Sequence, residues 1–219
     1  MSLDAGNIGQ AVGLSYELEV LPTQRAVYAK WEDWPASRID HHMRACCEFA
    51  REWIINTDFS NLNGADILTG PRWLRHRFEW GPGTYPIYWC ELSSKRKLDC
   101  GVLSALAYEV FVARGVRSFR AQLVQEFSAD AAAQWRSGWE GENAITEWIQ
   151  APLIYHEGVA VLTSGSNIKL WDSSAGWWID PRSTSGYGSV RALRVTGPAD
   201  AEFQWGEHTI PGAMWSAMT

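Results

Sequence analysis

Residues 99–114 read DCGVLSALAYEVFVAR and are followed at once by Gly115. Apart from Ser104 and Glu109, the residues between Asp99 and Arg114 are apolar on every side of a helix, which is typical of a helix that is buried all round. Asp99 is a residue type that caps the start of a helix, and a glycine just after the last turn is typical of its end. We therefore expect a central buried helix here, with the rest of the fold built around it.

Strands are expected to follow this helix along the chain. Short or alternating apolar runs predict strands over residues 116–127, 153–162, 168–172, 177–179 and 189–195. Between the first two, residues 129–150 have a helical composition that Gly138 and Gly141 interrupt, and we expect them to form an insertion that covers a site.

The part of the chain before the buried helix is expected to be mostly helix and loop. Residues 14–21 alternate as a strand does, residues 37–56 carry the helical period, and residues 57–97 form a long loop rich in glycine and proline, with a short helix near 71–78. Helices first and an antiparallel sheet afterwards is an α+β order. We therefore expect one α+β domain over residues 1–219.

The composition is that of an ordinary globular protein. The chain has 219 residues, of which 46% are hydrophobic and 20% charged, and its formal net charge is −6. A negative net charge argues against a nucleic acid or an anionic membrane as the main partner of the protein. No apolar run approaches the roughly 18 residues of a membrane span, and the first residues lack the order of a secretory signal. We expect a soluble, cytoplasmic protein and make no prediction of its oligomeric state.

Two residue types stand out in the composition. The four cysteines are at positions 46, 47, 90 and 100, too few for a disulfide framework and without a C-x-x-C pair, so we expect thiols. His42 and Cys46 lie one helical turn apart, which suggests a metal site, but no second pair has matching spacing, so we predict neither metal nor cofactor. The 14 tryptophans suit either a core or the lining of a binding groove.

Cys100 is the candidate nucleophile. The aligned peptide dipoles and the unpaired N–H groups of the first helical turn favour a thiolate and lower the pKa of a thiol placed there. Gly101 leaves room for an incoming carbonyl group, and the N–H groups of this turn could stabilise an oxyanion. The negative charge of Asp99 opposes the effect on the thiol. The other interpretation is that Cys100 is a small buried residue that opens a core helix.

A nucleophile of this kind needs a base, and the base needs an orienting group. His156 stands near the start of one expected strand, and Asp172 stands at the end of the next. Because a tight turn joins the two strands, we expect these side chains to meet across the hairpin. The alternatives are that His156 is a satisfied polar residue and that Asp172 is a turn residue, since Asp-Ser-Ser is good turn chemistry.

These residues together carry a resemblance to a known family. The order Asp-Cys-Gly, a buried helix, Arg-Gly-Val leading into a strand, a histidine at a strand start and Trp-Asp-Ser-Ser ending the neighbouring strand resembles the transglutaminase-like superfamily of the papain-type thiol fold, over about residues 95–182. The resemblance implies a nucleophile helix packed on an antiparallel sheet and a triad of Cys100, His156 and Asp172.

Two departures qualify the resemblance. Residues 176–181, GWWIDP, resemble the ending that many members show at the triad aspartate, which makes Asp180 a rival. We favour Asp172 because its strand pairs directly with that of His156. In addition, the glutamine that papain-type proteases carry before the nucleophile is missing, so the second oxyanion donor stays open between Trp89 and a backbone amide of residues 81–94.

The reaction that the resemblance implies is acyl transfer through a thioester on Cys100. An amine would resolve the thioester in an acyltransferase, and water in a peptidase or amidase. We expect a small-molecule or peptide acyl substrate, which a carrier protein could present through phosphopantetheine to the basic residues at 72, 75, 77 and 95–97, although such residues are more often a solvated face. The alternative from another class is an inactive module that binds a peptide or a glycan.

Overall fold

The structure is a computed structural model that describes residues 43–44, 50–58, 78–81, 87–141, 149–182 and 188–218. The chain divides into two compact units: unit 2 comprises Ser37–Arg120 and Glu157–Ile179, and unit 1 comprises Met1–Ala36, Ala121–His156 and Asp180–Thr219. Strands β5 (Ser118–Glu126) and β7 (Leu153–Ser164) each have residues in both units. Within the described residues, no helix is long and apolar enough to cross a membrane.

Helix α6 (Cys100–Ala113) is the buried helix that the sequence predicts. Asp99 caps its start, because one carboxylate oxygen accepts the backbone N–H of Val102 at 2.8 Å. Its end is closed by Gly115, which has a φ of +73° and whose N–H donates to the carbonyl of Val112 at 2.9 Å. Glycine suits this position because residues with a Cβ rarely adopt the left-handed conformation.

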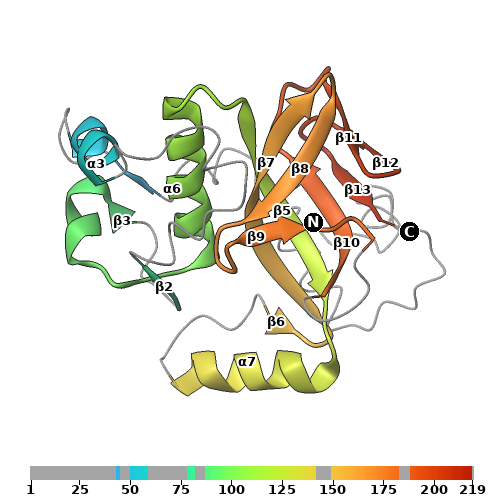
Figure 1. Ribbon diagram of the computed structural model, residues 1–219. Helices are drawn as coiled ribbons and strands as arrows, with labels where there is room; N and C mark the ends of the chain where they lie inside the picture. Colours follow the sequence, from blue (N-terminus) through green and yellow to red (C-terminus); the bar gives the residue numbers. More distant parts are fainter. Residues whose placement is uncertain are drawn as a thin grey trace, which may run out of the picture. The chain divides into compact units, whose positions relative to one another are not determined.

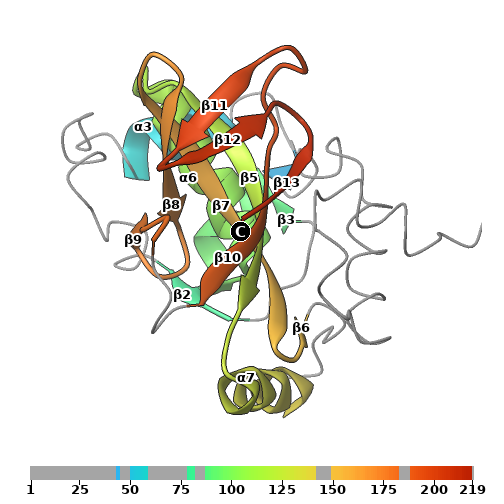
Figure 2. The ribbon, with the colours of Figure 1, turned by 90° about the vertical axis from the view of Figure 1, so that its right-hand side faces the viewer.

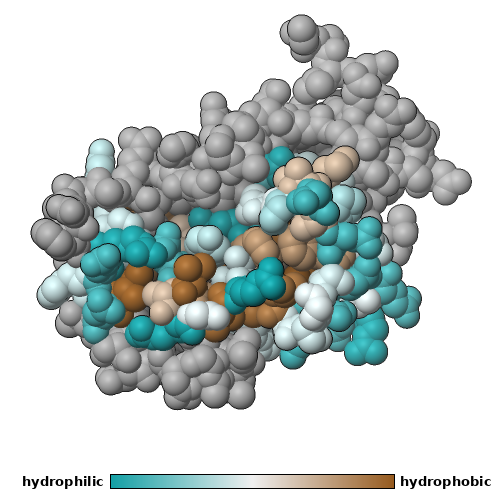
Figure 3. All heavy atoms as spheres, turned by 90° about the horizontal axis from the view of Figure 1, so that it is seen from above, coloured by the Kyte–Doolittle hydropathy of each residue, from teal (hydrophilic) through white to brown (hydrophobic). Residues whose placement is uncertain are grey.

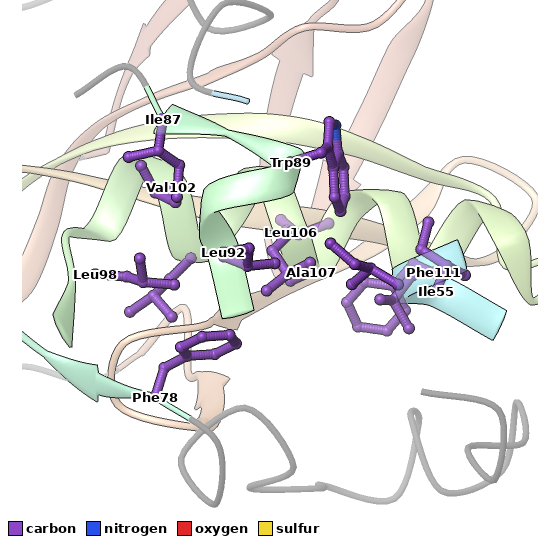
Figure 4. Packing of buried hydrophobic residues seen from close by; sticks show 14 of the residues in the cluster. Ile55, Phe78, Ile87, Trp89, Leu92, Leu98, Val102, Leu106, Ala107 and Phe111 are labelled. Carbon is purple, nitrogen blue, oxygen red and sulfur yellow. The ribbon is translucent and has the colours of Figure 1, made fainter. Parts of the chain in front are cut away.

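Unit 2 is packed around α6. Its other elements before α6 are β1 (Met43–Arg44), α3 (Ala50–Asp58), β2 (Glu79–Trp80), β3 (Ile87–Tyr88), the 3-10 helix η2 (Trp89–Ser94) and β4 (Lys97–Leu98). Ile55 of α3 and Trp89 and Leu92 of η2 pack with Leu106 and Phe111 of α6 in one cluster of buried residues (Figure 4). Val159, Val161 and Trp171 belong to the same cluster, and their strands β7 and β8 run beside α6 (Figure 1). The helix is therefore enclosed by its own unit.

Residues 157–179 of unit 2 form an antiparallel hairpin with one further strand. In this hairpin β7 pairs with β8 (Asn167–Asp172), and Val159 lies opposite Trp171. Strand β9 (Trp177–Ile179) then pairs antiparallel with β8. The turn between β7 and β8 is Gly165-Ser166, where Gly165 has a φ of +56°. These pairings confirm the predicted hairpin.

Unit 1 is built mainly from strands. In it, β5 pairs antiparallel with β10 (Ser189–Val195), and β10 pairs antiparallel with β13 (Trp215–Ala217). Strands β11 (Glu202–Trp205) and β12 (His208–Pro211) form a hairpin, and β6 (Ile149–Gln150) pairs with the start of β7 (Figure 2). Helix α7 (Ala129–Gly141) packs through the buried Ala132 and the half-buried Trp135, whose ring lies 4.7 Å from that of Phe127. The described residues are thus of the predicted α+β class.

Several predictions of secondary structure were wrong. The helix expected over 37–56 is interrupted by strand β1, because Met43 and Arg44 pair with Ile87 and Tyr88, far along the chain. The expected loop over 57–97 contains three short strands and a 3-10 helix, too short to leave a periodic pattern. Helix α7 runs through Gly138 without a break, since one glycine costs a helix only about 1 kcal/mol.

Other predictions were missed or lie outside the described residues. Strands β11 to β13 were not predicted, although the two runs around Gly206 alternate as hairpin strands do. The strand expected over 14–21 and most of the short helix near 71–78 lie outside the described residues. The single domain and the covering role of residues 129–150 stay predictions.

Candidate functional site

Cys100 is the first residue of α6 and is not part of a disulfide. Its side chain is half-buried, whereas Gly101 and the six residues that follow are buried. The cap made by Asp99 determines where the helix begins, so the thiol stands beside the N–H groups of the first turn. This is the position that the sequence predicts for a nucleophile.

A buried ion pair lies against the first turn of α6. Nη2 of Arg120 lies 2.7 Å from Oε2 of Glu157, and the two side chains are only 4% and 1% exposed. The same nitrogen donates to the carbonyl oxygen of Gly101 at 3.1 Å. One turn further along, Oγ of the buried Ser104 donates to the carbonyl oxygen of Glu157 at 2.9 Å. Two side chains therefore tie residue 157 to the start of α6.

Sequence reasoning missed this group of polar side chains. Arg120 stands in a strand of mixed composition, and Glu157 follows His156 in a strand that is largely apolar. A charged residue within a strand that is otherwise apolar is a signal that could have been used, because buried charges need partners.

Asp172 ends β8 and is completely buried. Its Oδ1 accepts the backbone N–H groups of Ser174 and Ala175, each at 2.9 Å. The carboxylate therefore organises the turn after β8, which is the turn role that the sequence left open. This role is compatible with an orienting role, since a carboxylate has two oxygens that accept several hydrogen bonds.

Asp180, the rival of Asp172, is exposed and lies just after β9. It accepts the backbone N–H of Arg182 at 2.9 Å, and this hydrogen bond lowers the pKa of Asp180 below its ordinary value. An exposed carboxylate paired with its own neighbour is poorly suited to orient an imidazole ring.

The residues of β7 and β8 divide between the two faces of the hairpin. Val159, Val161 and Trp171 pack around α6, and the carboxylate of Glu157 reaches Arg120 beside the same helix. Since neighbouring residues of a strand point to opposite faces, Asp172 faces away from the α6 cluster. Along β7, the same alternation places the side chain of His156 on the opposite face to that of Glu157, which is the face that Asp172 has on β8.

The three candidate residues belong to different units. Cys100 and Asp172 lie in unit 2, and His156, which is buried, is the last residue of a segment of unit 1. Its neighbour in the chain, Glu157, is the residue tied to α6. The triad as a whole stays a prediction.

Other predicted site residues have simpler surroundings or lie outside the described residues. Trp89 is buried in the core beside α6, and Arg96 pairs with Glu79 at 2.8 Å on the surface. The basic residues 72, 75 and 77, the pair His42 and Cys46, and residues 82–86 lie outside the described residues. Among the described residues, no group of histidine, cysteine and carboxylate side chains could hold a metal ion.

Cys90 corrects the prediction that the cysteines are thiols. It stands in η2 and is disulfide-bonded. Its neighbours in the chain, Trp89 and Leu92, pack in the cluster around α6. The disulfide therefore lies in a segment that packs against the helix of the candidate nucleophile.

Large apolar side chains also reach the surface. Those that are exposed among the described residues are Trp53, Trp80, Tyr88, Val112, Trp177 and Met214. Figure 3 shows one face, on which apolar residues reach the surface between strongly polar ones. These side chains are the observation that favours the alternative of a binding module.

The chain was compared with protein-family models, with curated proteins and with solved structures, and none of the three comparisons found a match.

Proposed function

We propose that the protein is a cysteine-dependent acyl-transfer enzyme of the transglutaminase-like or papain-like type, with Cys100 as its nucleophile. The observation that carries the proposal is the half-buried thiol at the first residue of a capped helix whose residues 101–107 are all buried. Such a position favours the thiolate form and supplies N–H groups for an oxyanion. The α+β surroundings of this helix, with an antiparallel hairpin against it, fit the proposal.

His156 serves as the base in this proposal and Asp172 as its orienting group. His156 takes the thiol proton, and the sulfur forms a bond to the carbonyl carbon of an amide, ester or thioester. The bond to the leaving group breaks, the leaving group takes the proton from the imidazole, and a thioester remains on Cys100. Water or an amine then attacks the thioester, the sulfur–carbon bond breaks, and the thiol regains a proton.

Asp172 is preferred to Asp180 for two reasons. Asp172 is completely buried, where a carboxylate acts strongly on a neighbouring imidazole, whereas Asp180 is exposed and bound to Arg182. The alternation of β7 and β8 also gives His156 and Asp172 a common face. In this mechanism the imidazole of His156 reaches the thiol of Cys100. By strand alternation, the side chain of Glu157, and not that of His156, lies on the face of β7 that packs against α6.

The second half of the reaction distinguishes transfer from hydrolysis. A pocket that excludes water favours transfer to an amine, and an open groove favours hydrolysis. We favour transfer, with residues 129–150 covering a small acyl substrate that a carrier protein could present. A peptidase or amidase is the alternative that uses the same three residues.

The disulfide changes our proposal for where the protein works. Disulfides persist in oxidising compartments and are rare in the cytosol. Because Cys90 is disulfide-bonded, we favour an oxidising compartment over the cytoplasmic location that the composition led us to expect.

The proposal is tested by trapping the thioester. The chain is mixed with p-nitrophenyl acetate, and intact-mass spectrometry is used to find an added acetyl group together with release of p-nitrophenolate. We expect an adduct on Cys100 that is lost in Cys100→Ala, and a rate of acylation that falls by about 10²–10⁴ in His156→Ala. Asp172→Asn is expected to slow acylation, and Asp180→Asn is expected to leave it unchanged.

The matched control is His208→Ala, a half-buried histidine of β12. Wild-type rates in His156→Ala would contradict the assignment of the base, and an unmodified Cys100 would contradict the enzyme itself. If Cys100 is not acylated, the rate at which it reacts with iodoacetamide is compared with that of an ordinary thiol. Equal rates would favour the binding module, with its exposed aromatic side chains.

A further inference from the structure

We infer that Arg120, Glu157 and Ser104 form a positioning group that holds the first turn of α6 in its reactive geometry. This inference rests on the proposed function, because it concerns the residues beside Cys100 and His156. None of the three touches the substrate in this account; they act through the backbone to which the reacting residues belong.

The peptide unit between Gly101 and Val102 is held at both ends. Its carbonyl oxygen accepts a hydrogen bond from Nη2 of Arg120 at 3.1 Å. Its N–H donates to Oδ1 of Asp99 at 2.8 Å. Because a peptide unit is planar, these two bonds determine its orientation. The orientation of the first turn, and with it that of the thiol and of the neighbouring N–H groups, follows from this peptide.

Glu157 links this peptide to the strand of His156. Its carboxylate pairs with the same nitrogen of Arg120, and its carbonyl oxygen accepts a bond from Ser104. The Cα atoms of His156 and Glu157 are about 3.8 Å apart, since they are joined by one peptide bond. The residue after the nucleophile and the residue after the base are therefore both bound to Arg120.

The burial of the ion pair indicates a role beyond stability. Arg120 and Glu157 are nearly inaccessible to water, so both charges have lost their hydration. Well-packed apolar side chains of similar size usually stabilise a protein as much as such a pair does, or more. What apolar side chains cannot do is orient the carbonyl of Gly101.

A second ion pair on α6 offers a matched control. Arg51 of α3 pairs with Glu109 of α6, and both side chains are partly exposed. Glu109 stands on the same helix, in the same unit and in the same kind of pair, but two turns away from Cys100. It differs from the group at the first turn in its distance from the thiol, in its exposure, and in that Arg51 binds Glu109, whereas Arg120 also binds the carbonyl of Gly101.

The first experiment uses the mildest variant. Ser104→Ala removes one hydrogen bond to Glu157, and Ser118→Ala removes a comparable bond from another buried serine to the carbonyl of Val116. We expect Ser104→Ala to lower kcat for acylation by p-nitrophenyl acetate by about five- to tenfold with KM unchanged, because only positioning in the transition state is lost. Wild-type kinetics in Ser104→Ala, or an equal fall in Ser118→Ala, would overturn the inference.

The second experiment removes both charges at once. Because Arg120→Met combined with Glu157→Leu leaves no unpaired buried charge, we expect this variant to keep its urea midpoint. We expect its kcat to fall by about a hundredfold, as for a misplaced reacting group, while Glu109→Gln keeps wild-type kcat. A folded double variant with wild-type kcat would refute the positioning role; if it fails to fold, Ser104→Ala decides.

The failure of this inference differs from that of the proposed function. If wild-type Cys100 forms no thioester, the enzyme and the positioning group are both refuted. If the wild-type chain is acylated and the Ser104 and double variants are acylated equally fast, only the positioning group is refuted.

Discussion

The first and the last turns of α6 differ in how their polar groups are satisfied. At the first turn, Asp99, Arg120 and Ser104 bind backbone atoms, and the arginine and the serine are buried. Toward the other end, Glu109 pairs with Arg51 in a partly exposed position, and Val112 of the last turn is 42% exposed. The polar contacts at the start of the helix are thus made by buried side chains, whereas the ion pair toward the other end is partly exposed to water.

The difference teaches where geometry is controlled in this helix. Packing of apolar residues encloses α6 along most of its length, but it does not determine the orientation of an individual peptide unit. Directional hydrogen bonds do, and they are placed at the end that carries the thiol of Cys100. The following variants are expected to sharpen this contrast.

The largest effect is expected in the enclosed part of the helix. Leu106 has no exposed surface, so Leu106→Ala leaves a cavity and is expected to lower the free energy of unfolding by about 2–5 kcal/mol in a urea titration. Val112→Ala, in the exposed last turn, is the control and is expected to cost less than about 0.5 kcal/mol. A loss of under about 0.5 kcal/mol in Leu106→Ala would contradict the central position of α6.

An intermediate effect is expected from reduction of the disulfide at Cys90. Since η2 covers α6, opening the disulfide is expected to lower the free energy of unfolding by about 2–4 kcal/mol, measured in urea with and without a reductant. Of the four cysteines, two are expected to react with a thiol reagent in denaturant without reductant. Four reactive thiols would show that the disulfide is not formed.

The smallest effect is expected at the cap of the first turn. Asp99→Ala removes the acceptor for the N–H of Val102 and is expected to cost about 0.5–2 kcal/mol in urea unfolding. Asp99→Asn keeps an acceptor and removes the charge, so we expect little loss of stability and faster alkylation of Cys100 by iodoacetamide. Equal losses of stability in both variants would argue that charge, and not the cap, stabilises this turn.

The accuracy of the sequence-based predictions follows the range of the interactions involved. The cap at Asp99, the end at Gly115 and the hairpin around Gly165 are local, and the structure has each of them as predicted. Strand β1 was missed because its partner, β3, lies more than forty positions away. The two-residue strands are too short to leave a pattern that repeats.

The candidate site follows the same rule. The sequence placed Cys100 at the start of the buried helix and Asp172 at the end of a strand, and both positions hold. Two features of the site could not be predicted from the sequence: the face of the hairpin on which Asp172 lies, and the ion pair of Arg120 with Glu157. Both depend on which face of the strands packs against α6. The disulfide at Cys90 was missed because composition says nothing of which cysteines meet.

By itself, the amino-acid sequence determined the buried helix, its two ends, the hairpin and the α+β class, because caps, turns and apolar periods act between residues that are near in the chain. The pairing of Arg120 with Glu157, 37 positions apart in the chain, follows from the tertiary structure alone. There the guanidinium of Arg120 donates both to the carboxylate of Glu157 and to the carbonyl of Gly101. The physical reason is that a buried charge is stable only with its partner, and the partner is chosen by packing in three dimensions.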